Sequence, residues 1–273
     1  MIAIADAGGT STEWRLISNE GISQFRTKGF NLASDDVKQL KDSLPTELFD
    51  LSLKVLHFYG AGVSDKNSKT LKDTLVDYLN VEQINVYPDT LAAARGLLEE
   101  KSGWVGVLGT GSAVFHYNGS VIDNRIPSLG YLMGDEGSGV ALGSAFIRSY
   151  LRGHFSDPLT DKIRKAFTEL NEANALQEVY QSGNSKGYFS QFVEFLGINQ
   201  SQEELYQLIY DCLDEFFEKY FVGDKPSEIS FSGSIAFHFG NILNAVARSK
   251  SIRINRIIQS PIAGLTLYHQ KNG

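Results

Sequence analysis

Residues 2–29 read IAIADAGGTSTEWRLISNEGISQFRTKG, and residues 104–125 repeat their plan in the sequence WVGVLGTGSAVFHYNGSVIDNR. In each stretch a short apolar run ends in a glycine-rich loop, and a second strand with alternating polar and apolar residues follows. A turn then leads into a third strand, and Asn118-Gly119 is a strong hairpin signal for that turn in the second stretch. The repeat predicts a duplicated protein with two lobes and a central cleft, where ligands commonly bind.

Strands and helices alternate over the rest of the chain. Buried strands are expected over 53–60 and 84–88, and helices over 64–80 and 89–100. After Gly139 the pattern is helical, with helices expected over 140–153, 157–171, 188–197 and 202–221. Further strands are expected over 228–232 and 256–260, with a helix over 235–249 between them. The pattern predicts an α/β architecture with an N-terminal lobe, 1–103, and a C-terminal lobe, 104–273.

Composition excludes several classes of function. The chain has 273 residues, 42% of them hydrophobic, and a formal net charge of -7, which predicts a globular protein without the basic patch of a nucleic-acid binder. The N-terminal MIAIADAGGT has neither the charge nor the length of a signal peptide or membrane span. Cys212, the only cysteine, lies in a helical pattern and is expected to be a buried core thiol. We expect a cytoplasmic protein with no nucleic-acid or membrane partner.

The two glycine loops, 8–11 and 109–112, are followed by strand-like residues rather than by a helix. They therefore lack the context of a P-loop or a dinucleotide fingerprint. Glycine lets backbone N–H groups converge on an anion, and the hydroxyls of the neighbouring Ser and Thr residues add donors. Any hairpin also favours glycine, so one such loop would carry little weight. Because the chain has two such loops, each directly after an apolar strand, the sequence favours a site in which both loops bind phosphate groups.

Three carboxylates lie in positions suited to chemistry. Asp6 ends the first strand and is a candidate ligand for Mg²⁺, or alternatively a turn former. Asp89 lies between a strand and a helix, where it is either a helix cap or a general base that takes the proton of an attacking hydroxyl. Asp135 lies in GDEGSG (134–139), in a stretch where nine of the 26 glycines fall between Gly106 and Gly143. Asp135 or Ser138 can cap the next helix, but close approach to a ligand accounts better for the flanking glycines.

In this order, the segments resemble the actin-like ATPases, and more closely the family that unites N-acetylglucosamine kinases with the activator ATPases of benzoyl-CoA reductase and 2-hydroxyacyl-CoA dehydratase. The segments that carry the resemblance are DAGGTST (6–12), PDTLAAA (88–94), GVLGTGSAVF (106–115), LGYLMGDEGSG (129–139), SGSIAF (232–237) and PIAGLTL (261–267). The resemblance implies two ribonuclease H-like βββαβαβα domains around a cleft. It also implies a final helix, near 261–272, that returns toward the N-terminal lobe.

The resemblance implies an ATP-dependent kinase that phosphorylates a sugar hydroxyl, most closely that of an amino sugar such as N-acetylglucosamine. Asp6 would hold Mg²⁺, Asp89 would be the base, and Asn31, Gly134 and Asp135 would lie near the sugar. ATP would be held by two sets of residues, Gly8, Gly9, Thr10 and Ser11 in the first loop and Gly109, Thr110, Gly111 and Ser112 in the second, with Gly233 and Ser234 near adenosine. The oligomeric state is open, and a homodimer is compatible with the sequence.

The sequence departs from the family pattern at two places. Ser232-Gly233-Ser234 stands where Gly-Gly is usual, and Pro88 stands where Asn is common beside the base. A sugar- or nucleotide-binding sensor without turnover is the alternative function, because fold does not fix function. An activator ATPase is a further alternative, but it needs two cysteines from each subunit, and this chain has one.

Overall fold

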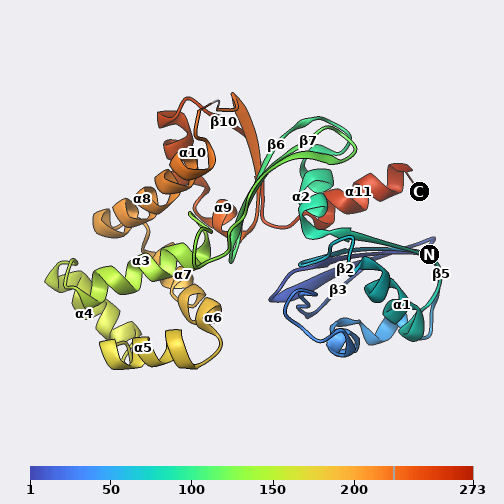
Figure 1. Cartoon of the computed structure of the whole chain (residues 1–273), viewed down its shortest axis with the longest axis horizontal. Helices are drawn as coiled ribbons and strands as arrows, with labels where there is room; N and C mark the ends of the chain where they lie inside the picture. Colours follow the sequence, from blue (N-terminus) through green and yellow to red (C-terminus); the bar gives the residue numbers. More distant parts are fainter. Residues whose placement is uncertain (224, 273) are drawn as a thin grey trace. The chain divides into compact units, whose positions relative to one another are not determined.

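The computed structural model describes residues 1–223 and 225–272, and the chain divides into two compact units (Figure 1). Unit 1 comprises Met1–Ser102, Tyr117–Ile122 and Ser260–Gly273, and unit 2 comprises Gly103–His116 and Asp123–Gln259. No helix in the described part of the chain has both the length and the apolar character needed to cross a lipid bilayer.

Unit 1 is built on a five-stranded sheet with the strand order β3-β2-β1-β4-β5. Its strands are β1 (Ile2–Ala7), β2 (Ser11–Ser18), β3 (Gly21–Lys28), β4 (Ser52–Gly60) and β5 (Asn80–Pro88). Its helices are α1 (Ser68–Tyr78), α2 (Asp89–Leu98) and α11 (Ile262–Asn272). The strand β1 pairs antiparallel with β2 and parallel with β4, and β4 pairs parallel with β5.

Unit 2 repeats this sheet with the strand order β8-β7-β6-β9-β10, in which β6 takes the place of β1. Its strands are β6 (Gly103–Leu108), β7 (Ser112–Tyr117), β8 (Ile122–Ile126), β9 (Glu228–Ser232) and β10 (Arg253–Ile258). The helices between β8 and β9 are α3 (Gly139–Leu151), α4 (Asp157–Ala166), α5 (Glu172–Gln181), α6 (Ser185–Ser190), α7 (Val193–Asn199) and α8 (Glu203–Tyr220). Two more, α9 (Ser234–His238) and α10 (Gly240–Ser249), follow β9. The matching strand orders confirm the duplicated α/β fold.

Several elements differ from the sequence-based expectation. The helices expected over 188–197 and 235–249 are each divided in two, as α6 with α7 and as α9 with α10. The first connection of unit 1 contains the 3-10 helices η1 (Val37–Ser43) and η2 (Thr46–Leu48) in place of an α-helix. Pro45 separates them, and proline both fixes its φ and lacks the N–H that would continue a helix. In unit 2, α5 occupies residues for which no helix was expected, and it begins where the Asn171 side chain accepts a hydrogen bond from Asn174 N.

Each sheet has its own apolar core. In unit 1, Trp14 and Phe58 pack edge to face on the side covered by α1 and η1. The opposite side packs Ile4 and Tyr59 against α2 and α11. In unit 2 the core lies between the sheet and α3, α8 and α10, and it includes Phe231 and Cys212.

Cys212 is buried in the core of unit 2, as the sequence predicts, and burial raises the pKa of its thiol to about 12.

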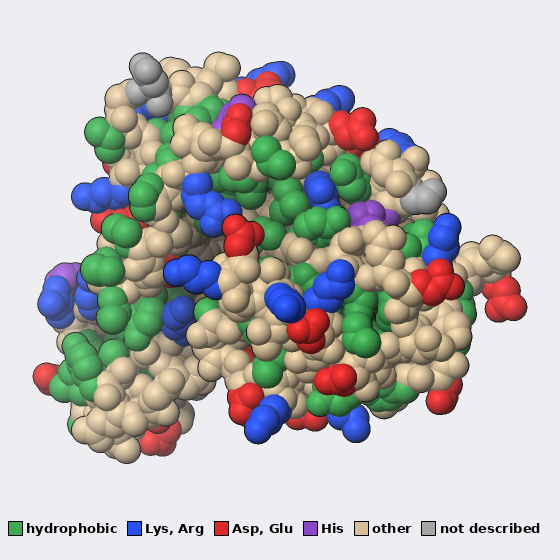
Figure 2. All heavy atoms as spheres, turned by 45° about the vertical axis from the view of Figure 1, so that its right-hand side comes forward, with side chains coloured by type: hydrophobic (Ala, Val, Ile, Leu, Met, Phe, Trp, Pro, Cys, Tyr) green, Lys and Arg blue, Asp and Glu red, His purple; other side chains and the backbone are tan. Residues whose placement is uncertain are grey.

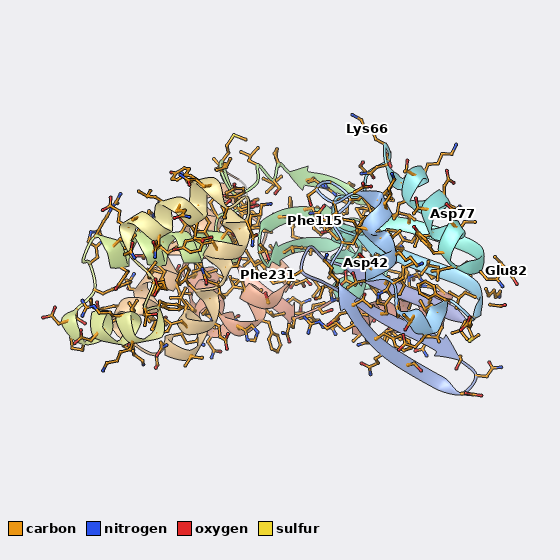
Figure 3. The ribbon with its side chains drawn as sticks, turned by 90° about the horizontal axis from the view of Figure 1, so that it is seen from below. Asp42, Lys66, Asp77, Glu82, Phe115 and Phe231 are labelled. Atoms are coloured by element: carbon orange, nitrogen blue, oxygen red, sulfur yellow. The ribbon has the colours of Figure 1, made fainter. Side chains whose placement is uncertain are left out.

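The surface of the molecule carries charged side chains. Figure 3 shows Phe115 and Phe231 inside unit 2, whereas Lys66, Asp77 and Glu82 point outward from unit 1. Acidic and basic side chains are interspersed over the face shown in Figure 2.

The C-terminal helix α11 packs directly against α2 in unit 1. At the contact, a Cβ on Gly264 would lie 2.1 Å from the carbonyl oxygen of Gly96, and a Cβ on Gly96 would lie 2.7 Å from Pro261 Cβ. Neither position has space for a side chain, so the two helices approach at backbone distance. Because α2 begins at Asp89, this contact helps to fix the position of a predicted site residue.

We predict that Gly264→Ala lowers the free energy of unfolding by about 1–3 kcal/mol, because the added methyl forces α2 and α11 apart. Urea unfolding followed by circular dichroism measures the change. Gly197→Ala in α7 is the matched control, since its Cβ would meet nothing within 4 Å. If both variants are as stable as the wild type, the helix contact is not as tight as described.

Candidate functional site

The first glycine loop connects β1 and β2, and the segment after β3 holds it in place through backbone hydrogen bonds. Phe30 N donates to Gly8 O at 3.0 Å, and Gly29 N donates to Thr10 O at 3.1 Å. A Cβ on Gly29 would lie 2.5 Å from the carbonyl carbon of Thr10, so only glycine permits this approach. Gly9 and Thr10 are exposed. With its carbonyls held on the inner side, the loop can offer exposed backbone N–H groups to an anion.

The second loop, between β6 and β7, is held in the same way by the start of α3. Gly139 N donates to Gly109 O at 2.8 Å, and Val140 N donates to Thr110 O at 3.3 Å. Thr110 is exposed. The structure therefore brings the second predicted phosphate loop and the GDEGSG run into direct contact within unit 2.

Asp135 joins these two segments through its side chain. It is 5% exposed, and its carboxylate accepts a hydrogen bond from Ser112 N at 3.2 Å. Its backbone φ of 58° lies in the left-handed region, which is uncommon for a residue with a side chain. Gly134 precedes it and donates its N–H to Gly130 O at 2.8 Å. The cap of α3 is Ser138, which accepts from Ala141 N, so capping does not account for Asp135.

Gly233 and Ser234 lie beside the second loop, at the end of β9. The φ of Gly233 is 120°, and a Cβ there would lie 2.2 Å from the carbonyl oxygen of Leu108, the last residue of β6. Gly233 N donates to Ile258 O at 3.0 Å. The predicted phosphate loop and the predicted adenosine segment of unit 2 are therefore packed together.

In unit 1, Asp6 and Asp89 lie at the carboxyl edge of the parallel strands. Asp6 is in register with Tyr59 of β4, Tyr59 is in register with Tyr87 of β5, and Asp89 follows one residue after β5 ends. Burial, together with the negative charges of Asp89 and Glu13, raises the pKa of Asp6 to about 7. Ligands commonly bind at this edge of a parallel sheet.

Glu13 was not identified from the sequence. It faces Asp6 across the β1–β2 pair, and Ser260 Oγ, just before α11, donates to its Oε2 at 2.6 Å. A single glutamate in an alternating strand gives no local signal of such a role. Its place beside Asp6 depends on strand register, and its bond to Ser260 depends on the return of the distant C-terminal segment.

Asp89 is the first residue of α2, and its side chain is exposed. Its Oδ1 accepts a hydrogen bond from Thr90 N at 2.8 Å, while Pro88 occupies the capping position. The carboxylate thus bonds to the start of the helix and remains accessible to a substrate.

Asn31 lies at the same edge of the unit 1 sheet, where it forms a parallel bridge with Ala61 just after β4. Its backbone N–H donates to Asp35 Oδ2 at 2.9 Å, and its side-chain Oδ1 accepts from Ala33 N at 3.0 Å. The side-chain oxygen therefore stabilises its own turn.

The side chains at the carboxyl edge of the unit 1 sheet determine what kind of metal ion could bind there. Among residues 1–223 and 225–272, no group of three or more His, Cys, Asp or Glu side chains is arranged to hold a metal. Asp6 alone supplies a carboxylate directly before the first glycine loop. This set fits Mg²⁺, which commonly takes one or two carboxylates and completes its coordination with phosphate and water oxygens.

Solved structures with a similar fold show the family of this chain. A protein described as a "putative N-acetylglucosamine kinase" from Porphyromonas gingivalis is 30% identical, with a TM-score of 0.91 over 100% of this chain and 99% of its own. The chain belongs to the actin-like sugar kinase family. No protein-family profile matches it, and no curated protein does.

Two more distant structures show the same fold as this sugar kinase chain. One is described as a "putative N-acetylglucosamine kinase" from Chromobacterium violaceum, with 17% identity and a TM-score of 0.74 over 98% of both chains. The other is a ROK family glucokinase from Streptomyces griseus in complex with glucose and AMPPNP, with 15% identity and a TM-score of 0.58 over 100% of this chain and 99% of its own.

Behind the carboxyl edge of unit 1, a network of side chains fixes α2 of the kinase chain. Arg95 NH1 donates to Tyr59 Oη at 2.9 Å, and Tyr59 Oη lies 2.9 Å from His269 Nε2 of α11. The Arg95 guanidinium also lies 4.6 Å from the ring centre of Tyr87 and 5.1 Å from that of Tyr268. These contacts join α2, β4, β5 and α11, so they hold the helix that begins with Asp89.

We predict that this network makes stability depend on pH. His57 and His269 stack with ring centres 3.6 Å apart. Burial and the charge of Arg95 lower the pKa of His57 to about 4, and burial, His57 and Arg95 lower that of His269 to about 3. An unfolded histidine titrates near 6.5, so stability is complete above that pH and is lost as pH falls toward 4.

Urea unfolding between pH 7.5 and 5 measures this dependence. Linkage gives a loss of up to about 2 kcal/mol from His269 between pH 6.5 and 5. His269→Gln keeps a polar partner for Tyr59 but cannot titrate, so its stability should fall less steeply. The exposed His238 serves as the control, and His238→Gln should keep the wild-type slope. Equal slopes in all three proteins would contradict the prediction.

Proposed function

We propose that the chain transfers the γ-phosphoryl group of ATP to a hydroxyl of a sugar, and that the sugar is an amino sugar such as N-acetylglucosamine. The observation that carries the proposal is the placement of Asp6 and Asp89 at the carboxyl edge of the parallel strands β1, β4 and β5, beside a glycine loop whose carbonyls are held on its inner side. Phosphoryl transfer needs alignment, charge neutralisation and a base for the attacking hydroxyl. The loops would align the phosphates, Mg²⁺ held by Asp6 would neutralise charge, and Asp89 would be the base.

The phosphates of ATP would be held by the backbone N–H groups and hydroxyls of the two loops. Thr10 and Ser11 contribute from the first loop, and Thr110 and Gly111 contribute from the second. Asp135 would keep the second loop in its binding shape through the bond to Ser112 N, in addition to any contact with the sugar. Gly233 and Ser234, packed against the end of β6, would lie near adenosine.

Asp6 would hold Mg²⁺ with phosphate and water oxygens, and that ion supplies neutralisation of charge on the phosphates. Asp89 would accept the proton of the sugar hydroxyl as its oxygen attacks the γ-phosphorus. Asp89 is exposed, and its bond to Thr90 N fixes one carboxylate oxygen at the start of α2. Asn31 and Gly134 would contribute to the sugar site.

Support for the amino sugar comes from the Porphyromonas gingivalis protein, with which this chain shares 30% of its residues. The alternative, a binding sensor without turnover, has the same fold and lacks the reaction. The presence of both Asp6 and Asp89 favours the kinase, since a sensor needs no general base. The activator ATPase remains disfavoured, because the chain has one cysteine and it is buried in α8.

We predict that Asp89→Asn lowers kcat for sugar-dependent ADP release by about 10²–10⁴, the range for a positioned general base. The amide keeps an oxygen for Thr90 N, so the start of α2 and ATP affinity should be unchanged. The control is Asp77→Asn, at an exposed aspartate near the end of α1. The assay covers amino sugars and hexoses.

Two outcomes contradict the proposal in different ways. If Asp89→Asn keeps near wild-type turnover, Asp89 stabilises the helix start and is not the base. If no sugar stimulates ADP release by the wild type while sugar or nucleotide still binds, the sensor function replaces the kinase function.

A further inference from the structure

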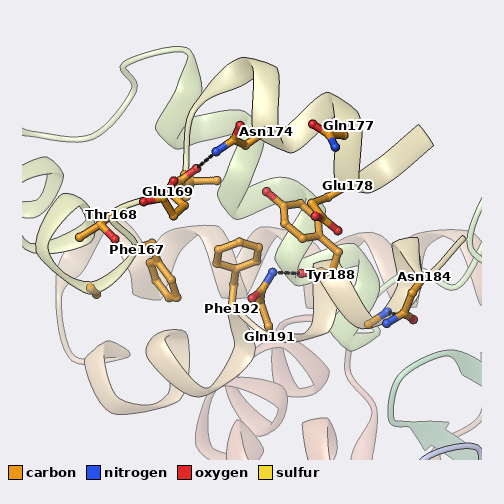
Figure 4. Close-up of a pocket in the computed structure, with 13 residues that line it drawn as sticks. Phe167, Thr168, Glu169, Asn174, Gln177, Glu178, Asn184, Tyr188, Gln191 and Phe192 are labelled. Carbon is orange, nitrogen blue, oxygen red and sulfur yellow. Dashed lines mark hydrogen bonds between the residues drawn. The ribbon is translucent and has the colours of Figure 1, made fainter. Parts of the chain in front are cut away.

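A groove in unit 2 lies among α4, α5 and α6, apart from every residue assigned above (Figure 4). Its volume is about 760 Å³, within the range of small-molecule sites. The end of α4 with the residues that follow forms one side, and α5 and α6 form the others. The groove is therefore large enough for a ligand of more than one ring.

The helix α5 forms a polar wall of the groove. Asn174, Gln177 and Glu178, spaced three and four residues apart, line the groove. Leu176 and Tyr180 of the same helix are 50% and 79% exposed. A surface helix ordinarily turns its apolar stripe inward and its polar residues outward. The helix α5 follows this pattern, because Ala175 is buried in the core while Gln177 and Glu178 are exposed at the groove. The wall of the groove is therefore polar, which favours water or a polar ligand in it.

Aromatic side chains form the floor of the groove. Phe167 and Phe192 meet edge to face with ring centres 4.9 Å apart, and Tyr188 packs against Phe192 at 5.5 Å. Phe192 is buried, whereas Tyr188 is partly exposed at the groove. In Figure 4 the Tyr188 ring lies between Glu178 of α5 and the α6 backbone. Tyr188 thus offers an apolar surface beside polar groups.

Four of the polar side chains that line the groove are amides. Side-chain amides come from α5, as Asn174 and Gln177, and from the start and end of α6, as Asn184 and Gln191. Each amide has both a donor and an acceptor, the combination that matches neighbouring hydroxyls. Asn174 Nδ2 and Gln191 Nε2 bond to the backbone carbonyls of Glu169 and Tyr188, which fixes their orientation.

The charge of the groove restricts its ligand further. Glu169 and Glu178 lie in its lining, and no Lys, Arg or His is found among the described residues that line it. A phosphate or carboxylate would meet negative charge without a positive partner, so anionic ligands are disfavoured. A neutral ligand rich in hydroxyls avoids this repulsion, can bond to the amides and can place an apolar ring face on Tyr188.

We propose that this groove is a second saccharide site, which binds a neutral sugar chain of two or more rings. The α5 amides hold the hydroxyls, Tyr188 stacks on one sugar ring, and the carboxylates exclude phosphorylated sugars. The site does not depend on the kinase activity proposed above, because it lies entirely on α4, α5 and α6 of unit 2.

Binding is tested by nuclear magnetic resonance on the full-length, isotopically labelled protein without nucleotide. The neutral probes are maltose and N,N'-diacetylchitobiose, and glucose 6-phosphate is the anionic probe. We expect at least one neutral disaccharide to shift the backbone amide signals of 166–170, 174–178 and 184–192, with a Kd on the order of 1 mM. Glucose 6-phosphate should leave these signals unchanged, whatever it does at the kinase site.

Two tyrosines provide a matched pair of variants. Tyr188→Ala should weaken binding about tenfold or more, the effect of losing about 1.4 kcal/mol. Tyr180→Ala removes the same side chain from the outward face of α5 and should leave binding unchanged. If Tyr188→Ala does not fold, Gln177→Ala, at an exposed position, should still weaken binding at the groove signals.

Three results would overturn the proposal. The first is the absence of shifts at the groove with both neutral disaccharides. The second is stronger binding of glucose 6-phosphate than of the neutral probes at these signals. The third is an equal loss of affinity in Tyr180→Ala and Tyr188→Ala. None of these results bears on kinase turnover, so failure of this proposal and failure of the kinase proposal are separable.

Discussion

A hydrogen bond to the carbonyl oxygen of a loop glycine, Gly8 in unit 1 and Gly109 in unit 2, is the contact on which the candidate site depends. In each unit the donor comes from the segment that follows the third strand, Phe30 N in one and Gly139 N in the other. Because the carbonyls are held on the inner side, the outer surface of each loop is left to N–H groups and hydroxyls. Asp6 adjoins the first loop at the end of β1, and Asp135 contacts the second loop through its bond with Ser112 N.

Much of the fold could be predicted from the sequence, because its signals are local. An apolar run, a glycine loop and an alternating strand occur twice, over 2–18 and 104–117. Each copy predicts the first two strands of a sheet, and the repeat predicts two sheets with the same topology. The helices with strong periodicity, such as α8, were predicted for the same reason. Asp6 could be selected because it lies at the end of an apolar strand before a glycine loop, and Asp89 because it lies between a strand and a helix in a segment that resembles the kinase family.

What the sequence did not reveal depends on contacts between distant segments. Glu13 acquires its place beside Asp6 only through strand register and the return of Ser260. The pair His57–His269 and the bonds of Arg95 require α11 to pack against the sheet of unit 1. The helix α5 was not predicted because Ala175 is its only fully buried residue, so it lacks the repeated apolar positions by which a helix is ordinarily found.

Phosphoryl transfer to a sugar is tested most directly by following the phosphate itself. The protein is incubated with Mg²⁺, N-acetylglucosamine or another hexose from the panel, and ATP labelled with oxygen-18 in its γ-phosphate. Mass spectrometry then locates the label. Transfer as derived from Asp6, Asp89 and the two loops predicts a sugar monophosphate that carries the labelled phosphoryl oxygens. Label found only in inorganic phosphate, or remaining in ATP with every sugar, would contradict it.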